Sequence, residues 1–72
     1  MTNYIIKVFN EKDYQTTEKV FSDYKKALSK YEELKNIAKN TRKPFTVCLY
    51  ANRNDIETLY ETVNPTRIIK IN

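Results

Sequence analysis

One amphipathic stripe in the middle of this 72-residue chain constrains its fold more than any other feature. Ser22 is the expected N-cap of a helix, with Asp23 in its first turn, and Pro44 disfavours helical geometry in the residue before it. We therefore expect one helix over about residues 22–40, which must pack its apolar side on a second layer. At roughly 100° per residue, one face of this helix carries six apolar residues, namely Tyr24, Ala27, Leu28, Tyr31, Leu34 and Ala38.

The segments on both sides of this helix are rich in β-branched and aromatic residues, which is typical of strands. Polar turn residues separate them, so neighbouring strands are expected to form antiparallel hairpins. Residues 56–63 also fit a short helix, and both alternatives stay open. Strands are expected at residues 3–9, 14–21, 45–50, 56–63 and 67–71. The sequence predicts an α+β fold over residues 1–72 as a single small domain, with one antiparallel sheet of four or five strands in the order ββαββ(β) packed on one amphipathic helix.

The chain contains no glycine. Asparagine and aspartate tolerate positive φ better than other residues do, so they are expected to form the turns. The strand over residues 45–50 alternates, and places Phe45, Val47 and Leu49 on one side. Turn positions are predicted at Asn10, Asn40, Asn52, Asn54 and Asn64, with residues 52–55 forming one turn.

The composition removes the usual catalytic patterns. Because the chain has no glycine, it contains neither a Walker loop nor a dinucleotide-binding fingerprint. Because it has no histidine, it lacks the usual general base and the usual zinc ligand. Cys48 lies mid-strand with no cationic neighbour in sequence. Glu57 and Glu61 would share one face of a strand but stand about 14 Å apart, too far for a glycosidase pair. We expect a protein that is not an enzyme and that has no metal and no cofactor.

The positive charge is concentrated on the helix and the turn after it. Residues 22–43 hold seven basic and three acidic side chains, which accounts for the whole net charge of +4. Lysines border the apolar stripe on both sides, Lys26 and Lys30 on one and Lys25, Lys35 and Lys39 on the other. Such lysines commonly lay their stems over the core edge, but clustered lysines also supply phosphate contacts to nucleic acids. Both alternatives stay open.

Six tyrosines and three phenylalanines supply material for an interface. Tyr50 has the parity of Thr46 and Cys48, opposite to Val47, so it is expected on the sheet face that the helix leaves open, together with other strand tyrosines. The candidate partner-binding residues are Tyr50, Tyr60, Lys25, Lys26, Lys30, Lys39, Arg42 and Lys43.

Three functional hypotheses follow. The leading one is a non-enzymatic protein-binding module, of the kind that phages and mobile elements use as small accessory or inhibitor proteins that dock on a host protein. The second is a small basic nucleic-acid-binding protein that uses helix lysines and tyrosines. The third is a structural homo-oligomer, with a homodimer as its simplest form.

No apolar run approaches the ~20 residues that span a bilayer, and the N-terminus enters a predicted strand without a signal-like segment. The single thiol suits a reducing compartment. We therefore expect a cytoplasmic protein without a membrane partner.

Overall fold

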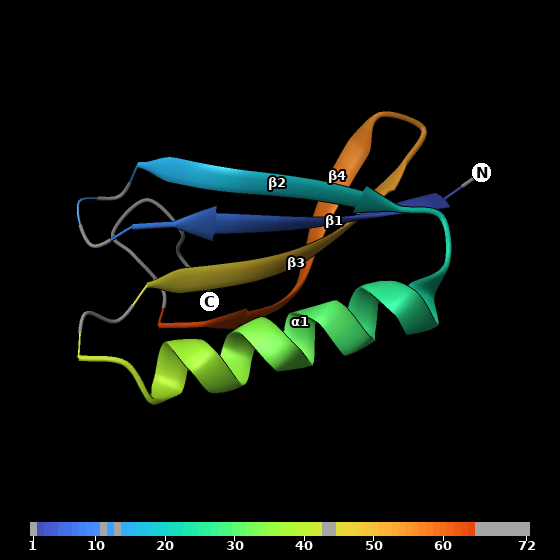
Figure 1. Cartoon of the computed structure of the whole chain (residues 1–72). Helices are drawn as coiled ribbons and strands as arrows, with labels where there is room; N and C mark the ends of the chain where they lie inside the picture. Colours follow the sequence, from blue (N-terminus) through green and yellow to red (C-terminus); the bar gives the residue numbers. More distant parts are fainter. Residues whose placement is uncertain (1, 11, 13, 43–44, 65–72) are drawn as a thin grey trace.

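The computed structural model describes residues 2–10, 12, 14–42 and 45–64 (Figure 1). Its strands form one antiparallel sheet in the spatial order β2-β1-β3-β4, and α1 lies on one face of this sheet. The elements are β1 (Thr2–Phe9), β2 (Gln15–Phe21), α1 (Tyr24–Lys39), β3 (Thr46–Arg53) and β4 (Ile56–Val63). The predicted α+β class and ββαββ order are confirmed, and residues 56–63 form a strand rather than a short helix. The further strand expected at residues 67–71 lies outside the described residues.

The ends of α1 are held by side chains as well as by the backbone. Asp23, not Ser22 as predicted, is the N-cap, and its carboxylate accepts a hydrogen bond of 3.1 Å from the backbone N–H of Lys25. At the other end the side-chain amide of Asn40 donates to the carbonyl of Asn36 at 2.8 Å. The helix is therefore slightly shorter than the expected range of about 22–40.

Asparagine and aspartate do replace glycine in the turns. Asn54 and Asp55 join β3 to β4 with φ of 54° and 62°, the left-handed pair that a two-residue hairpin requires. Asn64 also has a positive φ of 53° directly after β4. Asn10 uses its side-chain oxygen, which accepts from the N–H groups of two residues of the β1–β2 turn. Asn52 was predicted to lie in a turn but belongs to β3, because the hairpin turn is tighter than expected.

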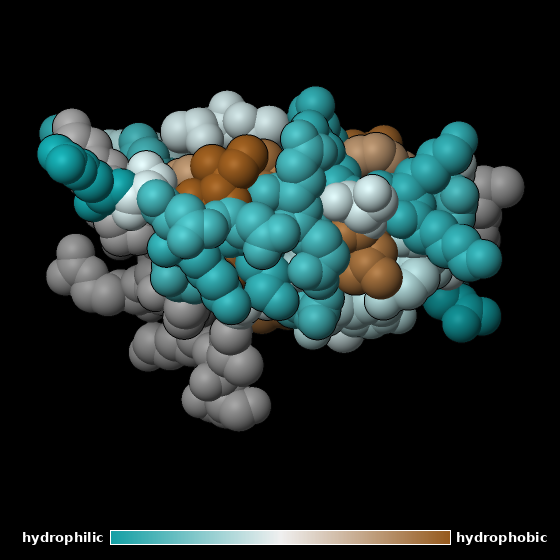
Figure 2. All heavy atoms as spheres, turned by 60° about the horizontal axis from the view of Figure 1, so that its bottom comes forward, coloured by the Kyte–Doolittle hydropathy of each residue, from teal (hydrophilic) through white to brown (hydrophobic). Residues whose placement is uncertain are grey.

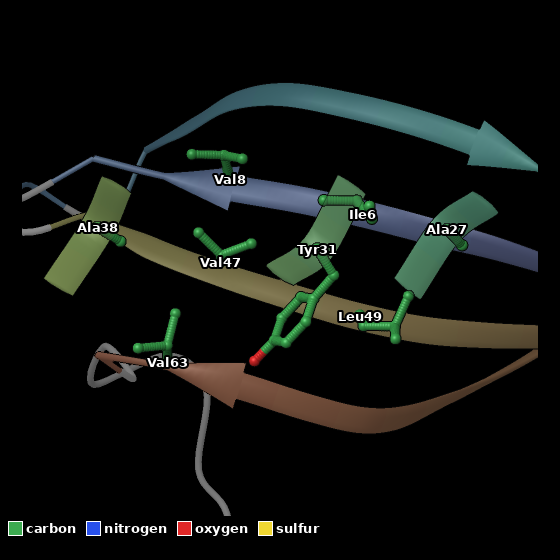
Figure 3. Packing of buried hydrophobic residues seen from close by; sticks show 8 residues of the cluster. All are labelled: Ile6, Val8, Ala27, Tyr31, Ala38, Val47, Leu49 and Val63. Atoms are coloured by element: carbon green, nitrogen blue, oxygen red, sulfur yellow. The ribbon is translucent and has the colours of Figure 1, made fainter. Parts of the chain in front are cut away.

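The core lies between α1 and the facing side of β1, β3 and β4 (Figure 3). Tyr31, which is 1% exposed, points from α1 across β3 toward β4. The predicted apolar face of β3 is confirmed for Val47 and Leu49, which are fully buried, while Phe45 packs on the margin of the core. The buried cluster comprises Ile6, Val8, Ala27, Tyr31, Ala38, Val47, Leu49 and Val63.

A bulge in the β3–β4 pairing reverses which side chains of β4 face the helix. Leu49 pairs with Glu61 and Tyr50 pairs with Leu59, so Tyr60 is the additional residue. Glu61 therefore lies on the face of Leu49, whereas Glu57, which pairs with Asn52, lies on the opposite face. The expectation that Glu57 and Glu61 share one face is wrong, because it assumed an unbroken alternation along the strand.

The two outer strands of the described sheet meet the helix differently. On the helix side β4 contributes the buried Val63 to the core. The residues of β2 on that side are Thr17, Lys19 and Phe21, since they pair with Val8, Ile6 and Tyr4 of β1. Only Phe21 of these three packs against the core. β2 thus contributes Phe21 to the margin of the core, while Thr17 and Lys19 do not pack against it.

Candidate functional site

A groove runs between β2 and α1 where the core does not extend. Its volume is about 740 Å³, and we call it the β2-side groove. Figure 2 brings the lower side of Figure 1, where α1 lies, toward the viewer, and shows hydrophobic surface between the polar side chains of this side. The groove is lined by Val8, Asn10, Lys12, Thr16, Thr17, Lys19, Lys30, Leu34 and Phe45.

Aliphatic and aromatic side chains form the apolar part of this groove. Val8 belongs to the buried cluster, and Leu34 and Phe45 are half-buried and pack against that cluster. Their remaining exposed surface faces the groove, because Thr17 on the neighbouring strand is too small to cover it. An apolar side chain of a ligand could therefore displace water from a preformed surface here.

Three lysines border the apolar part of the groove. Lys12 comes from the β1–β2 turn, Lys19 from β2 and Lys30 from α1. Lys30 also contacts the carboxylate of Glu33 at 3.4 Å. Neither Lys12 nor Lys19 has a carboxylate within 4.0 Å among the described residues. No acidic side chain is among the described residues that line the groove.

A smaller groove of about 440 Å³ lies on the other side of α1, and we call it the β4-side groove. Glu61 of β4 lines this groove together with Lys35 and Lys39 of α1. Burial, followed by the charge of Glu61, raises the pKa of Tyr31 to about 12, so its hydroxyl stays protonated at neutral pH. The lining residues are Tyr31, Lys35, Lys39, Leu59, Tyr60, Glu61, Thr62 and Val63.

Tyr60 belongs to a cluster of three tyrosines, which we call the tyrosine cluster. Its ring centroid lies 6.4 Å from that of Tyr4 and 6.5 Å from that of Tyr24, and the last two are 5.2 Å apart. Tyr24 and Tyr60 are 40% and 52% exposed. Tyr60 follows the alternation of Ile56 and Thr58 to the helix side, so it does not share the open face with Tyr50, where strand tyrosines were expected.

Tyr50 lies on the opposite face of the sheet, as predicted, in a polar network. The ammonium of Lys7 stands 4.9 Å from the centroid of the Tyr50 ring and contacts the carboxylates of Glu57 at 3.0 Å and Glu18 at 4.0 Å. Burial raises the pKa of Tyr50 to about 12. The ring of Tyr50 therefore makes contacts within the sheet and is not freely available to a partner.

Cys48 lies beside this network and is fully buried. Its sulfur is 3.4 Å from the hydroxyl oxygen of Thr62, and burial raises the pKa of the thiol. A thiol that is buried and protonated is a poor nucleophile. We find no group of three or more His, Cys, Asp and Glu side chains arranged for a metal in the described part of the chain.

The predicted lysines do not form one continuous face. Lys30 lines the β2-side groove and Lys39 the β4-side groove, which places them on the two borders of the stripe as the helical wheel predicts. Lys25 and Lys26 are exposed on the first turn of α1, and Arg42 is exposed beyond its end. Lys43 lies outside the described residues.

The sequence did not single out Lys12, Lys19 or Phe45 as site residues. Lys12 fitted a polar turn, Lys19 a polar strand and Phe45 the apolar face of a strand, so none of them indicated a binding site. The signal that could have found them is the polar character of β2, because a strand that hides little apolar surface leaves a gap beside its helix.

Comparisons of the chain with protein-family models, curated proteins and solved structures find no match. None of the helices in the described ranges is long and apolar enough to cross a bilayer.

Proposed function

We propose that this protein is a non-enzymatic binding module that docks on a partner protein through the side of the molecule formed by α1 and β2. The observation that carries the proposal is the β2-side groove, in which half-buried Leu34 and Phe45 leave apolar surface exposed between three lysines. Protein interfaces combine such an apolar centre with a polar rim.

The positions of the helix lysines support binding to nucleic acid less well than binding to a protein. Lys35 and Lys39 lie on the opposite side of α1 from Lys30, and both Lys30 and Lys35 contact glutamates of the same helix. A phosphate backbone is usually followed by a continuous positive track, often with arginine for bidentate contacts. Arg42 and Arg53 do not line either groove.

Site-specific photo-crosslinking would test the proposal. A benzophenone side chain replaces Lys19 in the groove, and a matched variant carries it at Asn36, which is exposed on α1 and lines neither groove. In bacterial lysate the variant at position 19 is expected to form a discrete adduct with a protein that the variant at position 36 does not capture. Identical adducts from both positions, or adducts with nucleic acid alone, would contradict the proposal.

The accessory or inhibitory role in a phage or mobile element stays a prediction. The identity of the captured protein would test it, because an inhibitor must reduce the activity of the protein to which it crosslinks.

A further inference from the structure

The β2-side groove is open along β2, which has one neighbouring strand among the described residues. In the described sheet β2 pairs with β1 and stands at the edge. Alternate residues of an edge strand direct their N–H and C=O groups outward, where an added strand can pair with them. A segment that pairs with β2 places every second side chain on the helix face, beside Thr17 and Lys19 and opposite α1.

The charges of the groove select the chemistry of such a segment. Lys12, Lys19 and Lys30 surround the space that its side chains would enter, and no acidic residue lines that space among the described residues. Carboxylates on the added strand would meet these lysines, and an apolar side chain among them would contact Leu34 and Phe45.

The other edge of the sheet suits the same segment less well. On its helix face β4 carries the acidic Glu61, and its bulge at Tyr60 interrupts regular pairing. On β2 the one acidic residue, Glu18, faces away from the groove and contacts Lys7. From these observations we propose that the β2-side groove binds an extended, acidic segment of a partner protein, which adds to the sheet beside β2 and inserts an apolar side chain between Leu34 and Phe45. This rests on the proposed function and specifies the partner.

Selection from a random peptide library tests the chemistry. Displayed peptides of about ten residues are long enough to follow β2 at roughly 3.3 Å per residue. Selection on the full chain is expected to enrich peptides that combine aspartate or glutamate with at least one large apolar residue. Enrichment of basic or uncharged peptides, or no enrichment, would overturn the acidic assignment.

Charge reversal then locates the site. The double variant Lys19→Glu/Lys30→Glu is expected to weaken the selected peptides at least tenfold in fluorescence polarisation. The matched variant Lys35→Glu/Lys39→Glu changes the net charge equally on the β4 side and is expected to change affinity less than threefold. Equal losses in both variants would show that only the overall charge attracts the peptide, and would overturn the site.

Backbone pairing has its own control in the peptide. In an extended peptide, alternate N–H groups point to opposite edges of the strand. N-methylation of one alternate set removes the donors from the edge that would pair with β2, and N-methylation of the other set removes donors from the far edge only. One set is expected to abolish binding and the other to preserve it. Two sets with equal effects would contradict an added strand.

Two further results separate the inference from the proposed function. In the first, single-stranded DNA or RNA binds more tightly than the best peptide, and this binding is lost in Lys19→Glu/Lys30→Glu. That result would identify the ligand as a nucleic acid and would overturn both the inference and the proposed function. A protein crosslinked from position 19 whose binding survives this charge reversal would preserve protein binding and overturn the acidic segment alone.

Discussion

On the β4 side of α1, Tyr31 and Val63 belong to the buried core and border a groove of about 440 Å³, whereas on the β2 side Thr17 and Lys19 line a larger groove of about 740 Å³. Lysines border α1 on both sides, so charge alone does not distinguish them. The difference comes from the strands. A few polar residues in one edge strand leave apolar surface of the core uncovered, while the opposite strand adds the buried Val63 to that core.

The largest expected effect concerns the packed side. Tyr31→Ala should lower the free energy of unfolding by about 3–5 kcal/mol, because it removes a fully buried ring. Leu34→Ala, on the open side, should cost only about 1–2 kcal/mol, since this side chain is half-buried. Urea unfolding of the two variants measures the contrast. Equal losses would show that the two sides of α1 are packed alike.

The hydroxyl of Tyr31 makes the packed side sensitive to alkaline pH. Its pKa is raised from 10.0 to about 12 in the folded protein, so the unfolded chain loses this proton first as pH rises. The stability that this group contributes is complete below about pH 10 and is lost between about pH 10 and 12. The loss is about 3 kcal/mol, at about 1.36 kcal/mol per tenfold change in the ionisation constant.

Denaturant unfolding across this pH range, compared between the wild type and Tyr31→Phe, measures that contribution. The phenylalanine variant should show a shallower fall in stability, since Tyr50, whose pKa is also about 12, still contributes. Parallel curves for the two proteins would contradict a buried, protonated Tyr31.

Filling the open side should raise stability and remove binding together. Thr17→Leu adds an apolar side chain on the helix face of β2, and should stabilise the fold by about 0.5–1 kcal/mol while it occupies the groove. Thr58→Leu is the matched variant on the helix face of β4, at a position that lines neither groove. A similar gain in both would mean that added apolar area, not the groove, explains the effect.

The smallest expected effects come from the ion pairs of α1. Lys30 contacts Glu33 at 3.4 Å and Lys35 contacts Glu32 at 3.7 Å, both on exposed helix surface. Double-mutant cycles should give about 0.2–0.5 kcal/mol for each pair, with little difference between the two sides. A coupling above about 1 kcal/mol on one side only would show that charge, rather than packing, distinguishes the sides.

The helix and the four described strands could be predicted because their periodicities are regular. The spacing from Tyr24 to Ala38 fixes the helix face, and the alternation of Val47 and Leu49 fixes the core face of β3. The bulge at Tyr60 could not be predicted, because the alternation along β4 contains no signal for an additional residue. It placed Glu61 on the helix face beside Tyr60, where an unbroken alternation would have placed it on the opposite face.

The groove depends on three segments that are distant in sequence. Lys12, Lys30 and Phe45 meet only because β1 pairs with both β2 and β3, which sets the distance between α1 and the sheet edge. Sequence placed Lys30 correctly at one border of the stripe. It could not show that the neighbouring strand would leave this border uncovered.

Chemical-shift mapping of the isotope-labelled protein during titration with the strongest selected acidic peptide tests most directly whether the β2 side of α1 is the binding side. The backbone amides of Thr17, Lys19 and Leu34 are expected to shift, while those of Leu59 and Thr62 in the β4-side groove remain unchanged. Shifts centred on Leu59 and Thr62, or spread evenly over both sides of the helix, would contradict it.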